Sequence, residues 1–270
     1  MVAIAISVKL DELQRTLGEL GGAVVAFSGG VDSSVVTAAA ARALGDRALA
    51  VTAVSPSLPP GELDGARRLA ARIGVRHLVV ATREAEREGY LANGDDRCYH
   101  CKDELYTVLS GIAAQGGYAW VASGTNVDDL GDHRPGLVAA REHSVRHPLV
   151  EAEMTKRDVR VVARELGLPV WDKPASACLS SRIAFGRRIT VGELTRVGRA
   201  ERLLKDLGFR QVRVRVHGDL ARVEVELPDL PRLAEHGVRD RVVDGLKDLG
   251  YRYVTVDLEG FRSGSMNPES

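Results

Sequence analysis

The chain has 270 residues, of which 44% are hydrophobic and 27% charged, so it can form one large domain or a large and a small one. Its formal net charge is zero, which excludes an overall electrostatic attraction to nucleic acid or to a membrane. The sequence has neither the roughly eighteen-residue apolar run of a membrane helix nor a signal-peptide pattern. We therefore expect a cytoplasmic protein without a membrane partner, whose three cysteines are thiols or metal ligands.

Short apolar runs alternate with helical segments through the first two-thirds of the chain. The predicted strands are residues 23–27, 48–54, 76–81 and 118–122. The predicted helices are residues 33–44, 62–73, 101–115 and 158–166. This alternation predicts an α/β fold, with a parallel sheet and helices on both of its faces.

The pattern changes near Arg188. Thr190 and Glu193 predict a capping box that opens a helix ending at Gly208. Then follow predicted strands at 212–216 and 221–227, a helix at 229–249 and a strand at 251–258. We therefore divide the chain into a larger domain, residues 1–188, and a smaller C-terminal α+β domain, residues 189–270, for substrate binding or oligomerisation.

A loop rich in glycine and serine joins the first predicted strand to the first predicted helix. Glycines let backbone amides approach an anion, and the helix N-terminus adds unpaired donors. Asp32 would repel a phosphate unless a cation lay between them, so we assign Asp32 to Mg²⁺. A purely structural glycine turn is the alternative. The predicted phosphate-binding residues are Ser28, Gly29, Gly30, Val31, Asp32, Ser33 and Ser34.

This string lacks the Gly-Lys-Ser/Thr ending of a Walker A motif and resembles the PP-loop of the N-type ATP pyrophosphatases. The resemblance implies a sheet like that of the adenine nucleotide alpha hydrolases, cleavage of ATP between its α and β phosphates, and an adenylylated substrate. A second polar loop follows the fourth predicted strand, and ligands of parallel sheets bind at the carboxyl ends of strands. We expect this loop to close on the same nucleotide through Gly124, Thr125, Asn126 and Asp128.

The three cysteines form a Cys-x-x-Cys pair, Cys98 and Cys101, and a distant third residue, Cys178. A structural zinc site would need a fourth ligand, for which His100 is awkwardly placed inside the pair. A thioredoxin-type redox pair and unrelated buried thiols are further alternatives. Because three cysteines suffice for an Fe–S cluster with one open iron, we favour a [4Fe-4S] cluster on these residues.

Four motifs extend the resemblance over most of the chain: residues 98–102, 124–129, 132–136 and 173–182. Together they resemble the LarE family, ATP-dependent sulfur transferases that build the nickel-pincer nucleotide cofactor of lactate racemase. The resemblance implies that the carboxylates of pyridinium-3,5-biscarboxylic acid mononucleotide are adenylylated and then converted to thiocarboxylates, with release of AMP and pyrophosphate. It also implies a sulfide donor as partner and a homo-oligomer, a hexamer.

Two sulfur sources occur in this family. Some members sacrifice the sulfur of the cysteine that matches Cys178, and others pass on sulfide from a cluster held by three cysteines. The presence of Cys98 and Cys101 places this chain with the second group. The resemblance thus implies catalytic roles for all three cysteines and for Asp32.

The implied substrate is anionic through its phosphate and its carboxylates, so we expect arginines to contact it. Arg182 follows Cys178 by four residues, and Arg134 lies within the motif at 132–136. The predicted substrate contacts are Arg134, Arg182, Arg213 and Arg215.

Arg213 and Arg215 are two apart on a predicted strand, so both side chains point to one face while the alternating valines Val212, Val214 and Val216 face the core. Such a pair could bind a phosphate through two parallel hydrogen bonds. The alternative is surface ion pairing with Glu224 and Glu226 on the neighbouring strand. Glu224 is also a candidate metal ligand.

Two other functions remain open. PP-loop tRNA thiolation enzymes also combine this ATP loop with a three-cysteine cluster, but they need a broad basic surface, which a net charge of zero does not favour. A nucleotide-binding module without catalysis is the second alternative.

Overall fold

The computed structural model describes residues 2–131 and 135–262 of the chain. These residues form two compact units. Unit 1 comprises Met1–Ser55, Gly61–Arg87 and Asp96–Ser176, and unit 2 comprises Pro56–Pro60, Glu88–Asp95 and Ala177–Ser270. This division differs from the boundary that we place at residue 188, because unit 2 takes the chain from Ala177 onward together with two short upstream segments.

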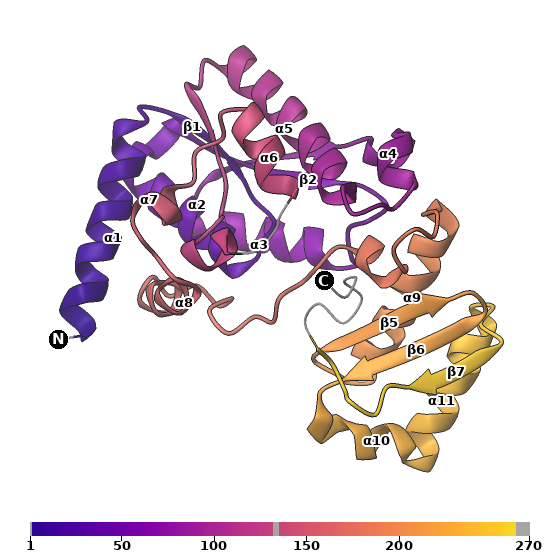
Figure 1. Cartoon of the computed structure of the whole chain (residues 1–270). Helices are drawn as coiled ribbons and strands as arrows, with labels where there is room; N and C mark the ends of the chain where they lie inside the picture. The colour runs from indigo at the N-terminus through magenta and orange to yellow at the C-terminus, as the bar shows by residue number, and fades with distance from the viewer. Residues whose placement is uncertain (1, 132–134, 263–270) are drawn as a thin grey trace. The chain divides into compact units, whose positions relative to one another are not determined.

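Unit 1 is built on a parallel four-stranded sheet with the strand order β3-β2-β1-β4, of which Figure 1 labels β1 and β2. The strands are β1 (Ala23–Ala26), β2 (Ala48–Val54), β3 (Arg76–Ala81) and β4 (Trp120–Ala122). The predicted strands at 48–54 and 76–81 coincide with β2 and β3, and the other two are shorter than predicted. The α/β fold expected from the alternating pattern is confirmed.

Successive residues of β1 face opposite sides of the sheet, as a strand requires. Val25 packs in a core cluster with one set of helices, and Val24 packs in a second cluster with another set. The first set is α1 (Val2–Glu19), α2 (Val31–Leu44), α3 (Glu62–Ile73), α7 (Pro148–Glu151) and α8 (Lys156–Glu165). The second set is α5 (Arg97–Gly116) and α6 (Pro135–Glu142). Helices therefore cover both faces of the sheet.

The N-terminal helix α1 is missing from our sequence predictions. Its buried residues Leu13 and Leu17 belong to the same core cluster as α2, with Leu10 partly buried beside them. Their spacing, continued by Leu20, is that of an apolar helix stripe and could have revealed the helix. None of the helices in the described part of the chain is long and apolar enough to cross a membrane. The short 3-10 turns of unit 1 are η1 (Gly45–Arg47), η2 (Glu84–Glu86) and η3 (Val127–Leu130).

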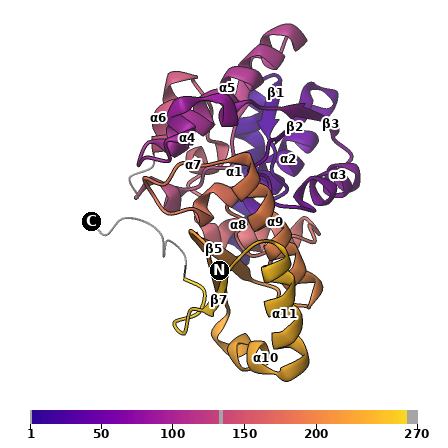
Figure 2. The same cartoon turned by 90° about the vertical axis from the view of Figure 1, so that its right-hand side faces the viewer.

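Unit 2 is the smaller α+β part of the chain. Its sheet has the order β5-β6-β7, with β5 and β6 antiparallel and β6 and β7 parallel. The strands are β5 (Val212–His217), β6 (Leu220–Val225) and β7 (Tyr253–Val256). Helices α9 (Val191–Asp206) and α11 (His236–Asp248) pack against this sheet (Figure 2). The remaining elements are α4 (Glu88–Leu91), η4 (Leu179–Arg182), η5 (Leu227–Asp229) and α10 (Leu230–Ala234).

Two local predictions need correction. The Thr190 side chain accepts a hydrogen bond from the Glu193 amide at 3.1 Å, but the Glu193 carboxylate pairs with Arg187 rather than completing a capping box. The continuous helix predicted over 229–249 is broken, because Glu235 adopts an extended conformation, with ψ at 132°, between α10 and α11.

The upstream segment Glu88–Asp95 is tied to the rest of unit 2 through Asn93. This fully buried residue has a φ of 57°, a left-handed conformation that asparagine tolerates better than most residues. Its side-chain amide donates hydrogen bonds to the carbonyl oxygens of Ala184 at 2.8 Å and Arg187 at 2.9 Å. A short piece of chain distant in sequence therefore fixes the loop that follows η4.

Candidate functional site

The predicted phosphate loop lies between β1 and α2, as the sequence indicates. Gly29 has a φ of 70°, and a Cβ at this position would come within 3.2 Å of the Ala66 Cα atom, so only glycine fits without strain. Gly30 is the N-cap of α2, and no side chain of the described residues caps the helix there. The first-turn amides of α2 and the helix dipole are therefore suited to an anion.

Serine hydroxyls stiffen this loop from within. Ser33 and Ser34 donate hydrogen bonds to the Gly30 carbonyl at 3.1 and 2.6 Å. The hydroxyl oxygens of Ser28 and Ser33 lie 3.1 Å apart, and the Gly30 amide donates to the Ser28 hydroxyl at 3.3 Å. These hydrogen bonds tie the residues of the loop to one another.

The second predicted loop, which follows β4, lies directly against the first. A Cβ on Gly124 would come within 2.7 Å of the Ser33 backbone nitrogen, which shows how closely the two backbones approach. The Asn126 side-chain amide donates a hydrogen bond to Asp32 Oδ1 at 3.2 Å. The Ser123 and Thr125 hydroxyl oxygens are 3.1 Å apart. The predicted residues of the two loops are therefore brought together in unit 1.

A cation that our sequence prediction missed completes this group. The Lys156 ammonium pairs with Asp32 Oδ2, and the Lys156 amide donates a hydrogen bond to Asp128 Oδ2 at 2.8 Å. Thr155 and Asp158 form a capping box that opens α8, which places Lys156 at the first helical position. The Thr-x-x-Asp pattern of Thr155 and Asp158 could have predicted this helix start from the sequence.

Lys173, which the sequence analysis places only within a motif, also contacts the loop. Its ammonium donates hydrogen bonds to the Gly29 carbonyl at 3.1 Å and to the Glu62 carboxylate at 2.7 Å. Lys102 of another motif lies over the ring of Tyr106, 5.7 Å from its centroid. Lys173 therefore contacts the phosphate loop.

The three cysteines are free thiols. Cys98 and Cys101 lie one turn apart at the start of α5 in unit 1, and Cys178 is the N-cap residue of η4 in unit 2. The Arg97 guanidinium approaches the Cys98 sulfur at 3.9 Å. Among the residues described within each unit, no three His, Cys, Asp or Glu side chains are grouped to hold a metal ion.

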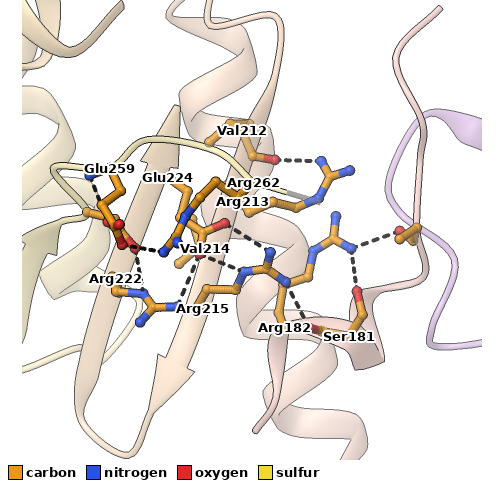
Figure 3. Close-up of polar contacts among 12 residues, drawn as sticks. Ser181, Arg182, Val212, Arg213, Val214, Arg215, Arg222, Glu224, Glu259 and Arg262 are labelled. Carbon is orange, nitrogen blue, oxygen red and sulfur yellow. Dashed lines mark hydrogen bonds and ion pairs between the residues drawn. The ribbon is translucent and has the colours of Figure 1, made fainter. Parts of the chain in front are cut away.

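Arg182, a predicted substrate contact, is only 1% exposed. Its Nε and Nη2 atoms donate hydrogen bonds to the two carboxylate oxygens of Glu201 at 2.7 and 3.0 Å. Its Nη1 atom donates to main-chain carbonyls and to the Ser181 hydroxyl (Figure 3). The partners of this side chain thus belong to unit 2, and its contact with substrate stays a prediction.

The surface environment expected for Arg213 and Arg215 is wrong. Both are buried, at 6% and 4% exposed, as are Val212, Val214 and Val216 of the same strand. Arg215 forms a buried ion pair with Glu224 at 2.9 Å, and Arg222 also pairs with this carboxylate at 3.1 Å. The predicted partner Glu226 is exposed. Glu224, the candidate metal ligand, is therefore engaged by two arginines.

Arg213 stands out electrostatically. Burial, and next the positive charge of Arg182, lowers the pKa of the Arg213 guanidinium to about 10, although Glu201 opposes this shift. The side chain donates a hydrogen bond to the Val212 carbonyl at 2.8 Å and lies over the ring of Phe261 at 5.0 Å. A buried guanidinium in this state would gain from a nearby anion. The last predicted contact, Arg134, lies outside the described residues.

Comparisons with known proteins agree with this geometry. The family described as asparagine synthase matches residues 22–106, which include the phosphate loop and β1 to β3. The chain is 47% identical to an uncharacterized protein of Synechocystis sp., over 96% of the chain and 97% of that protein. It is 41% identical to the pyridinium-3,5-bisthiocarboxylic acid mononucleotide synthase of Lactiplantibacillus plantarum, over 97% of the chain and 95% of that enzyme.

A tRNA-specific 2-thiouridylase MnmA of Azorhizobium caulinodans is 32% identical, but over only 57% of the chain and 49% of that enzyme. The match to the L. plantarum synthase, by contrast, extends over nearly the whole length of both proteins. The resemblance inferred from the cysteine and loop motifs is therefore confirmed, and the chain belongs to the LarE family of PP-loop enzymes, that of pyridinium-3,5-bisthiocarboxylic acid mononucleotide synthase.

Proposed function

We propose that this protein is an ATP-dependent sulfurtransferase that converts pyridinium-3,5-biscarboxylic acid mononucleotide into its thiocarboxylate form for a nickel-pincer cofactor. The observation that carries this proposal is the 41% identity to the L. plantarum synthase over 97% of the chain. The arrangement of the phosphate loop in unit 1 supports the ATP-dependent half of the reaction.

The first step makes a carboxylate replaceable. A carboxylate oxygen of the substrate attacks the α-phosphorus of ATP, the bond to the β-phosphate oxygen breaks, and pyrophosphate leaves. The α2 N-terminus and the Lys156 ammonium beside Asp32 offer the positive charge that stabilises a departing pyrophosphate. Asp32 would hold Mg²⁺ on these phosphates. The product of this step is an acyl adenylate.

The second step replaces AMP by sulfur. A sulfide equivalent attacks the acyl carbon, the bond to the AMP oxygen breaks, and AMP leaves with its electron pair. Two rounds give the product with two thiocarboxylates. The sulfide must come from a separate donor, because ATP yields only AMP and pyrophosphate, neither of which contains sulfur.

Three free thiols are the donor set that a [4Fe-4S] cluster with one open iron requires, so the residues present fit this group. Cys98, Cys101 and Cys178 would hold it, and when bound it would supply sulfide. The start of α5 suits two of these ligands, because it places the Cys98 and Cys101 thiols one helical turn apart.

Arg213 and Arg215 are proposed to bind the anionic substrate. The lowered pKa of Arg213 supports this role, since an anion would offset the cost of burying a charge beside Arg182. Arg215 is already paired with Glu224, so it would offer the anion less net positive charge than Arg213.

The test is an anaerobic reaction of the full chain with ATP, Mg²⁺, sulfide and the dicarboxylated pyridinium nucleotide. We expect substrate-dependent release of AMP and pyrophosphate, and a product in which mass spectrometry shows oxygen replaced by sulfur. Asp32→Asn should abolish pyrophosphate release, while Asp11→Asn, which changes an exposed carboxylate of α1, should not. Pyrophosphate release that requires tRNA instead of the pyridinium nucleotide would overturn the proposal.

The sulfur source is tested by Cys98→Ala. This variant should lose iron after reconstitution and stop after at most one turnover, because a cluster held by two thiols is not retained. Full multiple turnover in the iron-free variant would exclude the cluster. A different outcome, transfer of a single sulfur per chain by the iron-free variant with loss of one sulfur and two hydrogens from the chain mass, would identify Cys178 as a consumed donor.

A further inference from the structure

Arg182 and Glu201 form a fully buried ion pair, with both residues 1% exposed. Nε and Nη2 of Arg182 meet the two oxygens of Glu201 in a bidentate arrangement, at 2.7 and 3.0 Å. Burying two charges is costly, and such a pair persists only where further hydrogen bonds satisfy it. We call this pair the buried clamp.

The further hydrogen bonds of the buried clamp lead to Cys178. Nη1 of Arg182 donates to the carbonyl oxygens of Ala177 and Cys178, each at 2.9 Å. The Cys178 carbonyl also accepts hydrogen bonds from the Ser181 amide at 3.1 Å and from the Ser181 hydroxyl at 2.9 Å. Three donors therefore converge on the carbonyl of the cysteine that is proposed to take part in sulfur transfer.

The other end of the buried clamp is anchored in the core of unit 2. Glu201 lies on α9, and its Oε1 atom also accepts a hydrogen bond from the Val214 amide of β5 at 3.2 Å. One carboxylate thus joins a helix, a strand and the arginine that holds the cysteine turn. On the far side of Cys178, the Leu179 amide donates to the Ser57 carbonyl at 2.8 Å, so the turn is held from both sides.

We infer that Arg182, held by Glu201, is a positioning residue for Cys178 and fixes where its sulfur lies during sulfur transfer. This inference rests on the proposed function. The guanidinium is a rigid planar fork whose two edges serve Glu201 and the main chain at once. Because a displacement of about 1 Å at a reacting group can cost about a hundredfold in rate, a fixed turn matters for this step. Adenylylation, assigned to the phosphate loop of unit 1, does not depend on the clamp.

The test separates the two half-reactions in Arg182→Lys. Lysine keeps the charge but cannot bridge Glu201 and the Cys178 carbonyl in the same planar geometry. We expect pyrophosphate release to stay within about twofold of the parent protein, while thiocarboxylate formed per pyrophosphate falls about ten- to a hundredfold. Glu201→Gln should act in the same direction. The matched control is Arg196→Lys, which changes an arginine of α9, the helix of Glu201, that stacks on Tyr251 at 4.3 Å.

A product-to-pyrophosphate ratio in Arg182→Lys equal to that of Arg196→Lys would overturn the inference. Equal loss of pyrophosphate release and thiolation in a folded variant would also overturn it, in favour of a direct substrate contact. If Arg182→Lys does not fold, Glu201→Gln carries the same prediction.

A second readout does not need the proposed function to be correct. With Cys98 and Cys101 replaced by serine, Cys178 is the remaining thiol of the chain. Its alkylation by iodoacetamide, followed by intact mass, should become several-fold faster in Arg182→Lys than in Arg196→Lys, because the turn is released. Unchanged alkylation would refute the clamp, whereas absence of thiocarboxylate from the parent protein would refute the proposed function alone.

Discussion

Gly124→Ala tests how closely the two nucleotide loops approach. An alanine Cβ would lie 2.7 Å from the Ser33 backbone nitrogen and 3.0 Å from the Asp32 carbonyl carbon and the Ser33 Cα atom. All three neighbours are main-chain atoms at the start of α2, and no flexible side chain can yield. The two loops must therefore move apart by several tenths of an ångström or more.

Overpacking of this kind costs about 1–3 kcal/mol of the free energy of unfolding, which urea denaturation can measure. The displaced residues include Asp32 and Ser33 of the phosphate loop, so ATP affinity measured by calorimetry should fall about tenfold or more. The control is Gly131→Ala in the following turn, where φ is −76° and, chain neighbours aside, none of the described residues has an atom within 4 Å of the new Cβ. That variant should be unchanged, or stabilised by about 0.4–1 kcal/mol. Equal stability and ATP affinity in the two variants would refute the close approach of the loops.

Lys156→Met removes the cation beside Asp32. Because a hydrogen bond to a charged group contributes about 1.5–3 kcal/mol, the affinity for ATP should fall about tenfold or more. An unchanged Kd by calorimetry would mean that Lys156 does not contact the nucleotide. Arg215→Met removes one of the arginines that pair with the fully buried Glu224 carboxylate. The free energy of unfolding, measured in urea, should fall by about 3–5 kcal/mol. A decrease below about 1 kcal/mol would contradict this prediction. Burial lowers the pKa of the His77 imidazole in the folded state. As pH falls below about 6.5, His77 therefore binds a proton more readily in the unfolded chain than in the folded state, and the free energy of unfolding decreases. His77→Gln should flatten the profile of unfolding free energy between about pH 7 and pH 5, and equal slopes would exclude His77 as the cause.

The sequence was most informative where one local rule decides the structure. Strands β2 and β3 and helix α3 match their predicted limits, because short β-rich runs and a glycine after Ile73 mark them clearly. The break at Glu235 was missed, although Pro231 and Gly237 both lie within the helix predicted at 229–249 and disfavour a continuous helix there. Helix α1 was overlooked although its leucine spacing was visible.

For the site, the sequence indicated the ATP loop but not the residues that meet it through long-range contacts. Lys156 is far from Asp32 in sequence, and only the packing of α8 against α2 brings the two together. Arg213 and Arg215 were expected on a solvent-facing side because strand periodicity assigns one buried face and one exposed face. That rule fails where a strand is covered on both sides and its charged side chains are paired within the protein.

The Asn93 contacts have a consequence for how this protein can be cut or recombined. A fragment that begins at Ala177 would lack Asn93, and the carbonyls of Ala184 and Arg187 would lose the amide that satisfies them. Unit 2 therefore cannot be isolated as its longest segment, Ala177–Ser270, alone. A chimera of two relatives joined at Ala177 would take the segment 88–95 from one parent and the loop after η4, which Asn93 contacts, from the other. Exchange of the C-terminal unit between family members would require three stretches of sequence to be inherited together.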